Sequence, residues 1–197
     1  MSRKNNLLLL ALCGGVGGVK LIEGFTKILT PDQLITVVNT GDDDEFFGLR
    51  ICPDIDTTIY TLAGLSNKKT GWGLEKETWK ILTNLKRMGV NQWFQIGDND
   101  LLTHLIRTDL LKSGKTLTEV INHIRKLYGL KFQIVPMSDE WFQTKIITKN
   151  KKLSFQEYFV KLKCKPTVKS IVMEGQGENN GANPSPIFKK SIKSVSS

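Results

Sequence analysis

Short apolar runs alternate with amphipathic segments along most of the chain. Apolar runs bounded by turn-forming residues are typical of buried strands, and apolar positions that recur every three or four residues predict helices. By these patterns, strands are expected at 7–12, 34–38, 132–135, 144–148, 151–155 and 168–173, and helices at 19–29, 56–65, 74–88, 98–111, 116–128 and 187–195.

The alternation of strands with helices predicts an α/β fold with a mostly parallel sheet. The strands at 144–148 and 151–155 differ, because only Lys149 and Asn150 separate them and so short a connection predicts an antiparallel hairpin. At the helix starts, Thr116-Leu-Thr-Glu119 matches a capping box. Asp56 or Thr57 is the expected N-cap of the helix at 56–65.

The composition is that of an ordinary soluble globular protein, and we expect a single domain over residues 1–197 with a mainly helical segment at 66–130. The net charge is +9, but the lysine excess includes no arginine cluster and no aromatic stacking motif, so a nucleic-acid partner is not expected. No apolar run approaches the length of a transmembrane helix. Three cysteines without a C-x-x-C pair fit a reducing cytoplasm.

An acidic loop is the most informative part of the sequence. Residues 38–57 place a group of carboxylates between a predicted strand and a predicted helix: Asp42, Asp43, Asp44, Glu45, Asp54 and Asp56. Carboxylates this close together repel one another, and they suit Mg²⁺, which takes one or two carboxylates together with substrate phosphates. The alternative is a solvated loop in which aspartates occupy turn positions.

A glycine-rich turn precedes the acidic loop. Gly14, Gly15, Gly17 and Gly18 follow the first apolar run and lead into the first predicted helix. A strand, a glycine turn and a helix can present backbone N–H groups and a helix N-terminus to a phosphate. Lys20 stands where the Rossmann fingerprint has its third glycine, and the loop lacks the Gly-Lys-Ser/Thr that ends a Walker A motif. We therefore expect a phosphate-binding loop of another kind, or else a turn that only lets helix and strand pack closely.

Seven blocks of the sequence, taken in order, resemble one family. They are GGVGGVK, VVNTGDDDEFFGLRICPDIDT, YTLAGL, GWGLEKETW, IGDNDLLTHLIRT, PMSDE and FQEYFV. On these blocks, the chain is similar to the 2-phospho-L-lactate transferase family, which makes the deazaflavin factor-420 coenzyme. The resemblance implies a Rossmann-like three-layer α/β fold with a mostly parallel sheet and a helical insertion, and it implies Mg²⁺ as the cofactor.

The reaction that this resemblance implies moves a phospholactyl or phosphoenolpyruvyl group from a guanosine diphosphate-linked donor to the ribityl hydroxyl of the deazaflavin Fo, with release of GMP. A transfer of this kind mainly needs positioning and charge neutralisation. The implied partners are therefore two small molecules, Fo and a guanosine diphosphate-linked acid, with no nucleic acid and no membrane.

The resemblance also assigns roles to individual residues. Asp42 and Asp56 are the implied catalytic residues, and Asp42, Asp43 and Asp56 are the implied metal ligands; Asp54 is expected to be a turn residue after Pro53. Asn39 and Thr40 end a predicted strand, where α/β sheets place ligands. The complete set of expected substrate-binding residues is Gly14, Gly15, Gly17, Gly18, Asn39, Thr40, Asp56, Gln95, Asp98 and Arg107.

Two further groups of residues allow two interpretations each. Asp100, His104 and Arg107 share one face of a predicted helix. With Asp98, they form a wall of the site in which Arg107 meets a carboxylate or phosphate, or they form pairs within the helix. The four tryptophans, Trp72, Trp79, Trp93 and Trp141, either stack on the flat deazaflavin or belong to the core.

The chain departs from the family in length. Members are longer and carry S-N-P and S-I-x-P segments at the nucleotide site, which Asn183-Pro184 and Ser185-Pro186 do not match. We therefore expect an incomplete sheet, marginal stability of the chain alone, and either a homodimer or pairing with a missing C-terminal part. The alternatives to the transferase are a nucleotide-sugar-binding regulatory protein of a related glycine-loop group, an inactive fragment and a basic nucleic-acid binder.

Overall fold

A computed structural model describes residues 8–90, 93–177 and 181–195. Its strands are β1 (Leu9–Cys13), β2 (Leu34–Val38), β3 (Asp44–Phe46), β4 (Leu49–Ile51), β5 (Gln133–Pro136), β6 (Phe142–Thr148), β7 (Lys152–Ser154) and β8 (Val168–Gly175). Its helices are α1 (Gly15–Thr26), α2 (Pro53–Leu62), α3 (Lys80–Arg87), α4 (Asp100–Lys112), α5 (Leu117–Leu127), the π-helix η1 (Glu157–Lys161) and α6 (Pro186–Val195).

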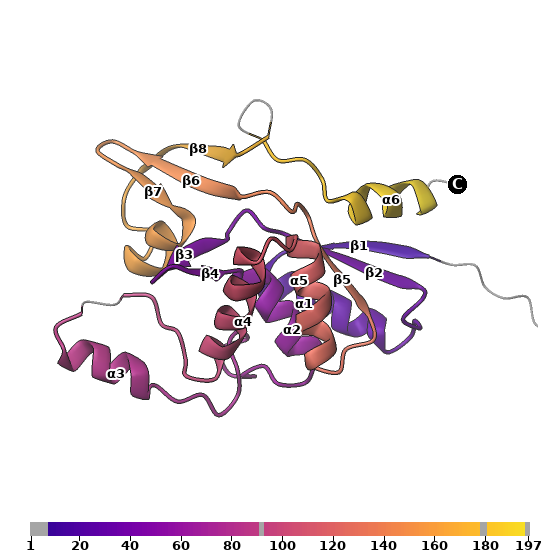
Figure 1. Cartoon of the computed structure of the whole chain (residues 1–197). Coiled ribbons are helices and arrows are strands. Elements are labelled where there is room, and N and C mark those ends of the chain that lie inside the picture. The colour runs from indigo at the N-terminus through magenta and orange to yellow at the C-terminus, as the bar shows by residue number, and fades with distance from the viewer. Residues whose placement is uncertain (1–7, 91–92, 178–180, 196–197) are drawn as a thin grey trace, which may run out of the picture.

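A parallel sheet forms the centre of the molecule. Its strand order is β1-β2-β5, and both neighbouring pairs run parallel, with Leu12 opposite Val37 and Val37 opposite Val135. Parallel neighbours need a crossover connection, and α1 supplies it between β1 and β2. In Figure 1, α1 and α2 lie below this sheet and α6 lies above it. The expected Rossmann-like α/β architecture is therefore confirmed.

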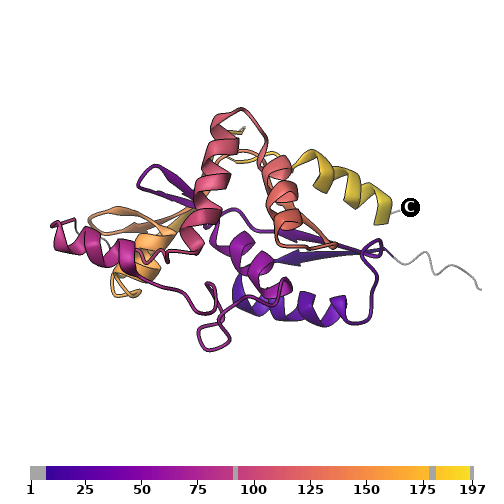
Figure 2. The ribbon, with the colours of Figure 1, turned by 60° about the horizontal axis from the view of Figure 1, so that its bottom comes forward.

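A second, antiparallel sheet has the strand order β7-β6-β8. The predicted hairpin is confirmed, because Ile146 of β6 lies opposite Leu153 of β7. The strand predicted at 168–173 becomes β8 and joins this sheet, with Ile171 opposite Ile146. Figures 1 and 2 show that α3 lies at the same end of the molecule as the antiparallel sheet.

Several element boundaries differ from the prediction. The first helix begins at Gly15 rather than residue 19, so the glycines belong to its first turns. The second helix begins at Pro53 with Cys52 as its N-cap, and the prediction of Asp56 or Thr57 as the cap is wrong. Proline favours the first helical position, because its missing N–H would be unpaired there anyway. The helix predicted at 74–88 is confined to Lys80–Arg87.

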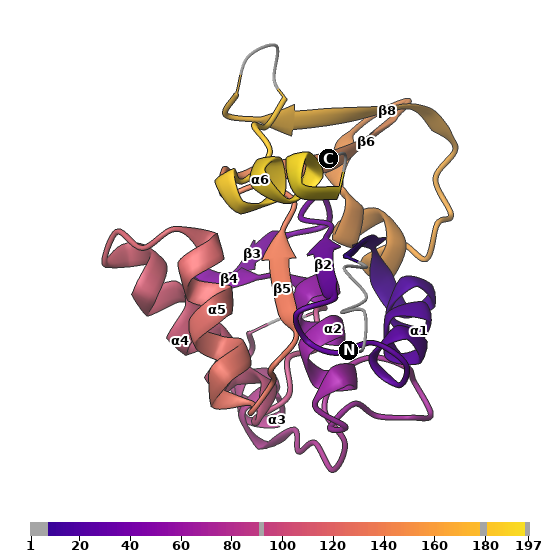
Figure 3. The ribbon, with the colours of Figure 1, turned by 90° about the vertical axis from the view of Figure 1, so that its right-hand side faces the viewer.

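The core lies between the parallel sheet and its helices. Val19 and Ile22 of α1 and Ile55 and Ile59 of α2 are almost fully buried against it. The buried face of α5 joins the same core through Ile121 and its neighbours, and the predicted capping box at Thr116 and Glu119 holds the start of α5. Figure 3 shows α1 and α5 on either side of the strands β2 and β5. In the described residues, no helix is long and apolar enough to cross a membrane.

The acidic loop is more ordered than a solvated loop. It contains the short β3–β4 hairpin, which the sequence did not predict. The antiparallel sheet contacts its backbone, since the Thr144 N–H donates to the Gly41 carbonyl (2.6 Å) and Gln143 Nε2 donates to the Asp43 carbonyl (2.8 Å). Gln156 Nε2 likewise donates to the carbonyl of Asp42 (3.1 Å). The second sheet therefore fixes the carboxylates relative to the first.

Candidate functional site

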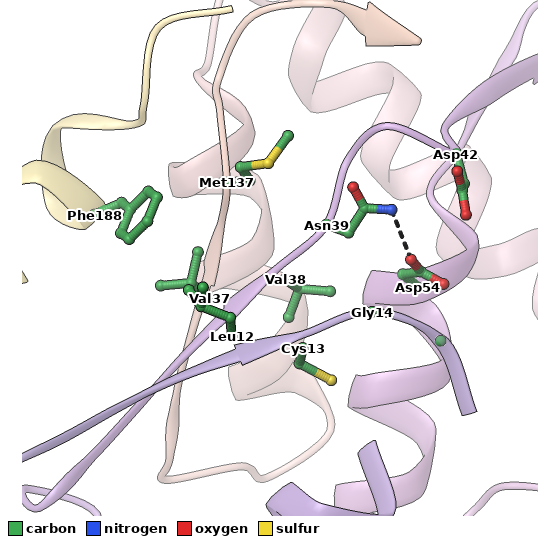
Figure 4. A pocket seen from close by; sticks show the side chains of 11 residues that line it. Leu12, Cys13, Gly14, Val37, Val38, Asn39, Asp42, Asp54, Met137 and Phe188 are labelled. Atoms are coloured by element: carbon green, nitrogen blue, oxygen red, sulfur yellow. Dashed lines mark hydrogen bonds between the residues drawn. The ribbon is translucent and has the colours of Figure 1, made fainter. Parts of the chain in front are cut away.

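Three segments meet at the carboxyl end of the parallel sheet. Gly14 follows β1, Asn39 follows β2, and Asp54 lies in the first turn of α2. Asn39 Nδ2 donates a hydrogen bond to Asp54 Oδ2 (2.9 Å), while Asn39 Oδ1 accepts one from the Gly41 N–H (2.9 Å). Figure 4 shows this junction with the carboxylates of Asp42 and Asp54 at one end of a cavity. Ligands commonly bind at this edge of α/β sheets.

The glycines of the turn differ in their surroundings: some line the cavity, and one packs on β1. Gly14 and Gly15 line the cavity in Figure 4, and a Cβ added at Gly15 would lie 3.5 Å from Asp54 Oδ1. Gly15 also has φ of +60°, a conformation that side chains disfavour. Gly18, by contrast, packs on β1, because a Cβ there would lie 3.1 Å from Cys13 Sγ. Gly17 has open space around it, so lining the cavity and packing closely on β1 belong to different glycines.

Asp42 and Asp54 form a pair of partly buried carboxylates. Burial and the negative charge of Asp54 raise the pKa of Asp42 to about 6, against a smaller opposing effect of Asn39. Burial also raises the pKa of Asp54, although hydrogen bonds from Asn39 and the Gly15 N–H oppose it. Asp42 is therefore costly to ionise beside Asp54, and a bound cation would relieve this repulsion.

Two cavities share these residues. The first, the sheet-edge pocket, has a volume of about 510 Å³ and combines the junction with apolar side chains. The second, the aromatic pocket, has a similar volume of about 510 Å³ and adjoins the first at the junction. Gly15, Asp42 and Asp54 line both. A molecule in one pocket can therefore reach a molecule in the other across the carboxylate pair.

The sheet-edge pocket changes character along its length. Leu12 and Val37 from neighbouring strands, together with Met137 and Phe188, form its apolar end, and the carboxylates form its polar end (Figure 4). The N-terminus of α1 opens onto the polar end. Its N-cap, Gly14, makes no side-chain cap, and its first turn contains no acidic residue. The Gly15 N–H at this N-terminus donates to the Asp54 carboxylate, and N–H groups at a helix N-terminus favour an anion.

The aromatic pocket offers flat surfaces to a ligand. Its lining includes Tyr60, Trp72, Trp93, Phe94, Phe155 and Phe159, together with Gln95. The interpretation of the tryptophans as core residues is wrong, because Trp72 is 47% exposed, Trp79 is 39% exposed, and Trp93 and Trp141 are only half-buried. Trp72 and Trp93 line the aromatic pocket, where Trp93 also packs edge-on against Phe94, whereas Trp141 lies under the guanidinium of Arg50 (3.8 Å).

Asp56 has a different environment from Asp54. Its Oδ1 forms a short ion pair with Nη2 of the fully buried Arg107. His104 and Asp100 complete the group: His104 Nδ1 lies 3.1 Å from Arg107 Nη1, and His104 Nε2 lies 3.1 Å from Asp100 Oδ2. Tyr60 Oη donates to Asp100 Oδ1 (2.6 Å). The predicted face of Asp100, His104 and Arg107 therefore exists, but it binds Asp56 of another helix as well as pairing internally.

Other predicted site residues lie outside these cavities. Asp43 is buried and accepts from Arg50 Nη2 (2.7 Å) and Cys52 Sγ (3.0 Å). Asp98 accepts from Thr78 and from the first N–H groups of α3. The described linings of the two cavities also omit Thr40, Gly17, Gly18 and Arg107. Their direct contact with a substrate or metal stays a prediction.

A divalent ion fits the Asp42–Asp54 pair better than the other candidate cluster. Asp56, Asp100 and His104 hold ligand-type atoms within 4.8 Å of one another. There, however, Arg107 already neutralises Asp56, and the two nitrogens of His104 face different partners. Neither Asp42 nor Asp54 has an ion-pair partner in the described part of the chain. Carboxylate oxygens are hard ligands of the kind that suits Mg²⁺.

Asp54 is the site residue that the sequence interpretation missed. It was expected to be a turn residue, which is wrong, because α2 already includes it. Pro53 was the available signal: proline at the first helical position would have placed Asp54 in the first turn, at a helix N-terminus that faces the glycine loop.

Comparison with known proteins gives concordant relatives. A family model described as 2-phospho-L-lactate transferase CofD matches residues 9–194. The chain is 38% identical over 193 residues to a phosphoenolpyruvate transferase of Streptomyces griseus, an alignment that covers 95% of this chain and 59% of that protein. It is 37% identical over 162 residues to a 2-phospho-L-lactate transferase of Methanococcoides burtonii, covering 82% of this chain and 53% of that protein.

The structural comparison agrees on the fold. A crystal structure of a UPF0052 family member from Bacillus halodurans superposes with a TM-score of 0.58 at 14% identity, covering 96% of this chain and 56% of that one. The chain thus spans a little over half the length of the relatives it matches.

Proposed function

The chain belongs to the 2-phospho-L-lactate transferase CofD family, and from that premise we propose that it is a transferase that moves a phospholactyl or phosphoenolpyruvyl group from a guanosine diphosphate-linked donor to the ribityl hydroxyl of the deazaflavin Fo, releasing GMP. The observation that carries the proposal is the meeting of two cavities at Gly15, Asp42 and Asp54. Two substrates bound on either side of this junction would have their reacting groups together.

The donor would occupy the sheet-edge pocket. A diphosphate carries concentrated negative charge, and the N-terminus of α1, which lines this pocket at Gly14 and Gly15, supports its binding. Asp42 and Asp54 would hold Mg²⁺, which supplies charge neutralisation for the phosphates when bound. The apolar end, with Leu12 and Phe188, would take the less polar part of the donor.

The acceptor would occupy the aromatic pocket. A deazaflavin is flat, and Trp72, Trp93 and Phe94 supply faces on which it can stack. Its ribityl chain would then extend toward Asp42 and Asp54. In the transfer, the hydroxyl oxygen forms a new bond to the phosphorus that is nearer the lactyl or enolpyruvyl group. The bond from that phosphorus to the GMP oxygen breaks, and its electron pair leaves with GMP. The hydroxyl proton is released. The protein mainly holds these atoms in line.

The proposed compartment is the cytoplasm. Cys13 and Cys52 are buried free thiols and Cys164 is an exposed one, and free thiols of this kind are common where the surroundings are reducing.

A turnover assay tests the proposal. The protein is incubated with Fo, Mg²⁺ and each of the two guanosine donors, and mass spectrometry detects the product of Fo together with GMP. Asp54→Asn should lower the rate at least about a hundredfold, because it removes one carboxylate from the proposed metal pair. Asp109→Asn is the matched control, since Asp109 is an exposed aspartate of α4 that lies outside both cavities.

Other outcomes would contradict the assignment. An Asp54→Asn variant with the normal rate would remove Asp54 from the mechanism. Binding of a UDP-sugar, together with no binding of Fo or of either guanosine donor, would instead favour the nucleotide-sugar-binding regulatory protein.

A further inference from the structure

Helix α3 is amphipathic, but its apolar side is open to solvent. Ile81, Leu85 and Met88 follow the spacing of four and three residues that places side chains on one face of a helix. No residue of α3 is buried; Ile81 is 46% exposed, and Met88, the C-cap, is 80% exposed. A short helix depends on the packing of its apolar face for stability. Among the described residues, nothing covers this face of α3 completely.

The aromatic pocket has an apolar rim that is also uncovered. Phe159 and Val160 line this pocket from η1 and its immediate neighbourhood, and they are 57% and 38% exposed. Trp72, which precedes α3, lines the pocket as well and is nearly half-exposed. Large apolar side chains grouped at an exposed position mark a surface that binds something. A flat ligand in the pocket would leave this rim in water unless another part of the protein covered it.

The chain itself connects the rim with the open face of α3. Residues on both sides of the helix line the aromatic pocket: Trp72 and Gly73 precede it, and Trp93, Phe94 and Gln95 follow it. Figures 1 and 2 show α3 at the end of the molecule that also bears η1, the turn that follows β7. These connections keep α3 close to the pocket, so the rim is a surface that its apolar face can reach.

Hydrogen bonds fix only the start of α3. Asp98 accepts from the Lys80 and Ile81 N–H groups (2.9 and 3.0 Å), and Glu77 accepts from the Asp100 N–H (3.0 Å). These bonds join the start of α3 to the start of α4, where Asp100 lines the aromatic pocket. In the described part of the chain, the C-terminal half of α3 makes no hydrogen bond or ion pair with another element. That half can therefore approach the pocket while the start stays in place.

We propose that α3 is a lid of the acceptor site, which turns about its fixed start and covers a flat ring system bound in the aromatic pocket. Ile81, Leu85 and Met88 would contact the ring and the rim that Phe159 and Val160 form. The inference rests on the proposed function, because the acceptor is taken to occupy this pocket. Closure would bury apolar surface of the helix, the rim and the ligand together, and it would keep water away from Asp42 and Asp54.

Hydrogen–deuterium exchange with and without Fo tests the lid directly. In the free protein, the amide hydrogens of residues 80–88 should exchange quickly, because α3 has no buried residue to oppose its local opening. With saturating Fo, exchange of these amides should slow at least about tenfold. Helix α6 is the internal control, since it is also largely exposed and lies outside the aromatic pocket. Its exchange should not change.

Ile81→Ser separates the lid from the fold. Ile81 does not belong to the hydrophobic core, so the variant should melt at nearly the same temperature as the unmodified protein. It should nevertheless bind Fo about fivefold more weakly by isothermal titration calorimetry and lose most of the protection of α3, because a serine cannot cover an apolar ring. Ile28→Ser is the matched control, since Ile28 is an isoleucine that is 76% exposed and lies outside both cavities. It should bind Fo normally.

The outcomes are distinguishable. Binding of Fo with unchanged exchange in α3, or normal binding by Ile81→Ser, would overturn the lid and leave the acceptor assignment intact. No binding of Fo at all would overturn the acceptor assignment together with the lid. Slow exchange in α3 that depends on protein concentration and not on Fo would show that a second copy of the chain covers the helix, which would also overturn the lid.

Discussion

Asp54 and Asp56 show how two equal side chains acquire different chemistry. They stand two positions apart in the first turn of α2, and residues with that spacing in a helix point in directions about 200° apart. Asp54 therefore faces Asn39 and the glycine loop, whereas Asp56 faces Arg107. Asp54 has no ion-pair partner among the described residues, while the charge of Asp56 is neutralised by Arg107.

The pKa of Asp43 gives a prediction about stability. Burial raises this pKa to about 6, against the opposing effects of Arg50 and Cys52, so the folded protein binds the proton more tightly than the unfolded chain, whose value is near 3.8. The stability that this group contributes is fully present below about pH 3.8 and is lost as the pH rises through about 6. Protonation of Asp43 should therefore raise the melting temperature as the pH falls from 7 to 5, and Asp43→Asn should show a smaller rise than the unmodified protein.

Melting curves followed by circular dichroism, with a chelator present, check this expectation. Asp44→Asn is the control, since Asp44 is the next aspartate and is only half-buried. An unchanged difference between pH 5 and pH 7 in Asp43→Asn would show that Asp43 stays ionised throughout that interval.

At the level of elements, the sequence predicted the strands well and the charged segments poorly. The runs at 34–38 and 144–148 could be located because burial selects continuous apolar residues there. The β3–β4 hairpin could not, because Asp44, Glu45 and Arg50 carry no apolar alternation. It is held instead by long-range contacts, such as the hydrogen bond from the Arg50 N–H to Thr108 Oγ1 (2.9 Å).

Some features of the candidate site could likewise be predicted from the sequence, and others could not. Gly14, Asn39 and Asp42 could be found from sequence, because strand ends and glycine turns mark the ligand edge of an α/β sheet. The partner of Arg107 could not, since Asp56 is far from it in the chain and only the packing of α4 against the hairpin strand β4 brings Arg107 near. Pairings between distant elements leave little trace in a local pattern.

The start of α1 supplies a prediction with an internal control. Gly15→Ala forces a side chain into a φ of +60°, which costs about 1–2 kcal/mol, and it places a methyl group beside Asp54 at the proposed phosphate site. We expect clearly weaker donor binding, measured by calorimetry with the guanosine donor and Mg²⁺. Gly17→Ala should bind normally and be more stable by roughly 0.5–1 kcal/mol, because Gly17 is helical with open space around it. Equal donor binding by both variants would show that the glycine turn does not contribute to donor binding.

At the scale of the molecule, the acidic loop joins two sheets whose described strands do not pair with each other. One end of the loop leaves β2 of the parallel sheet, and the antiparallel sheet holds its backbone through Gln143, Thr144 and Gln156. The position of Asp42 therefore depends on a sheet that contributes neither residue of the Asp42–Asp54 pair. A substitution in the antiparallel sheet that removes one of these hydrogen bonds should then alter the position of Asp42.

Gln143→Ala tests this dependence. Gln143 is 7% exposed, donates to the Asp43 carbonyl and to Asp44 Oδ1, and lies outside the two cavities. Its loss leaves a buried carbonyl unpaired, which should lower stability by about 1–3 kcal/mol. It should also free the backbone next to Asp42, so we expect Mn²⁺, a spectroscopic substitute for Mg²⁺, to bind several-fold more weakly by electron paramagnetic resonance.

Gln133→Ala is the matched control for that experiment. Gln133 is an exposed glutamine at the start of β5, in the sheet that bears the junction itself, so its removal should leave Mn²⁺ affinity and stability nearly unchanged. Weaker Mn²⁺ binding in Gln143→Ala alone would mean that the antiparallel sheet positions the metal pair from outside the site. Unchanged Mn²⁺ binding despite the lost stability would mean that Asn39 and the start of α2 position Asp42 and Asp54 without help from the second sheet.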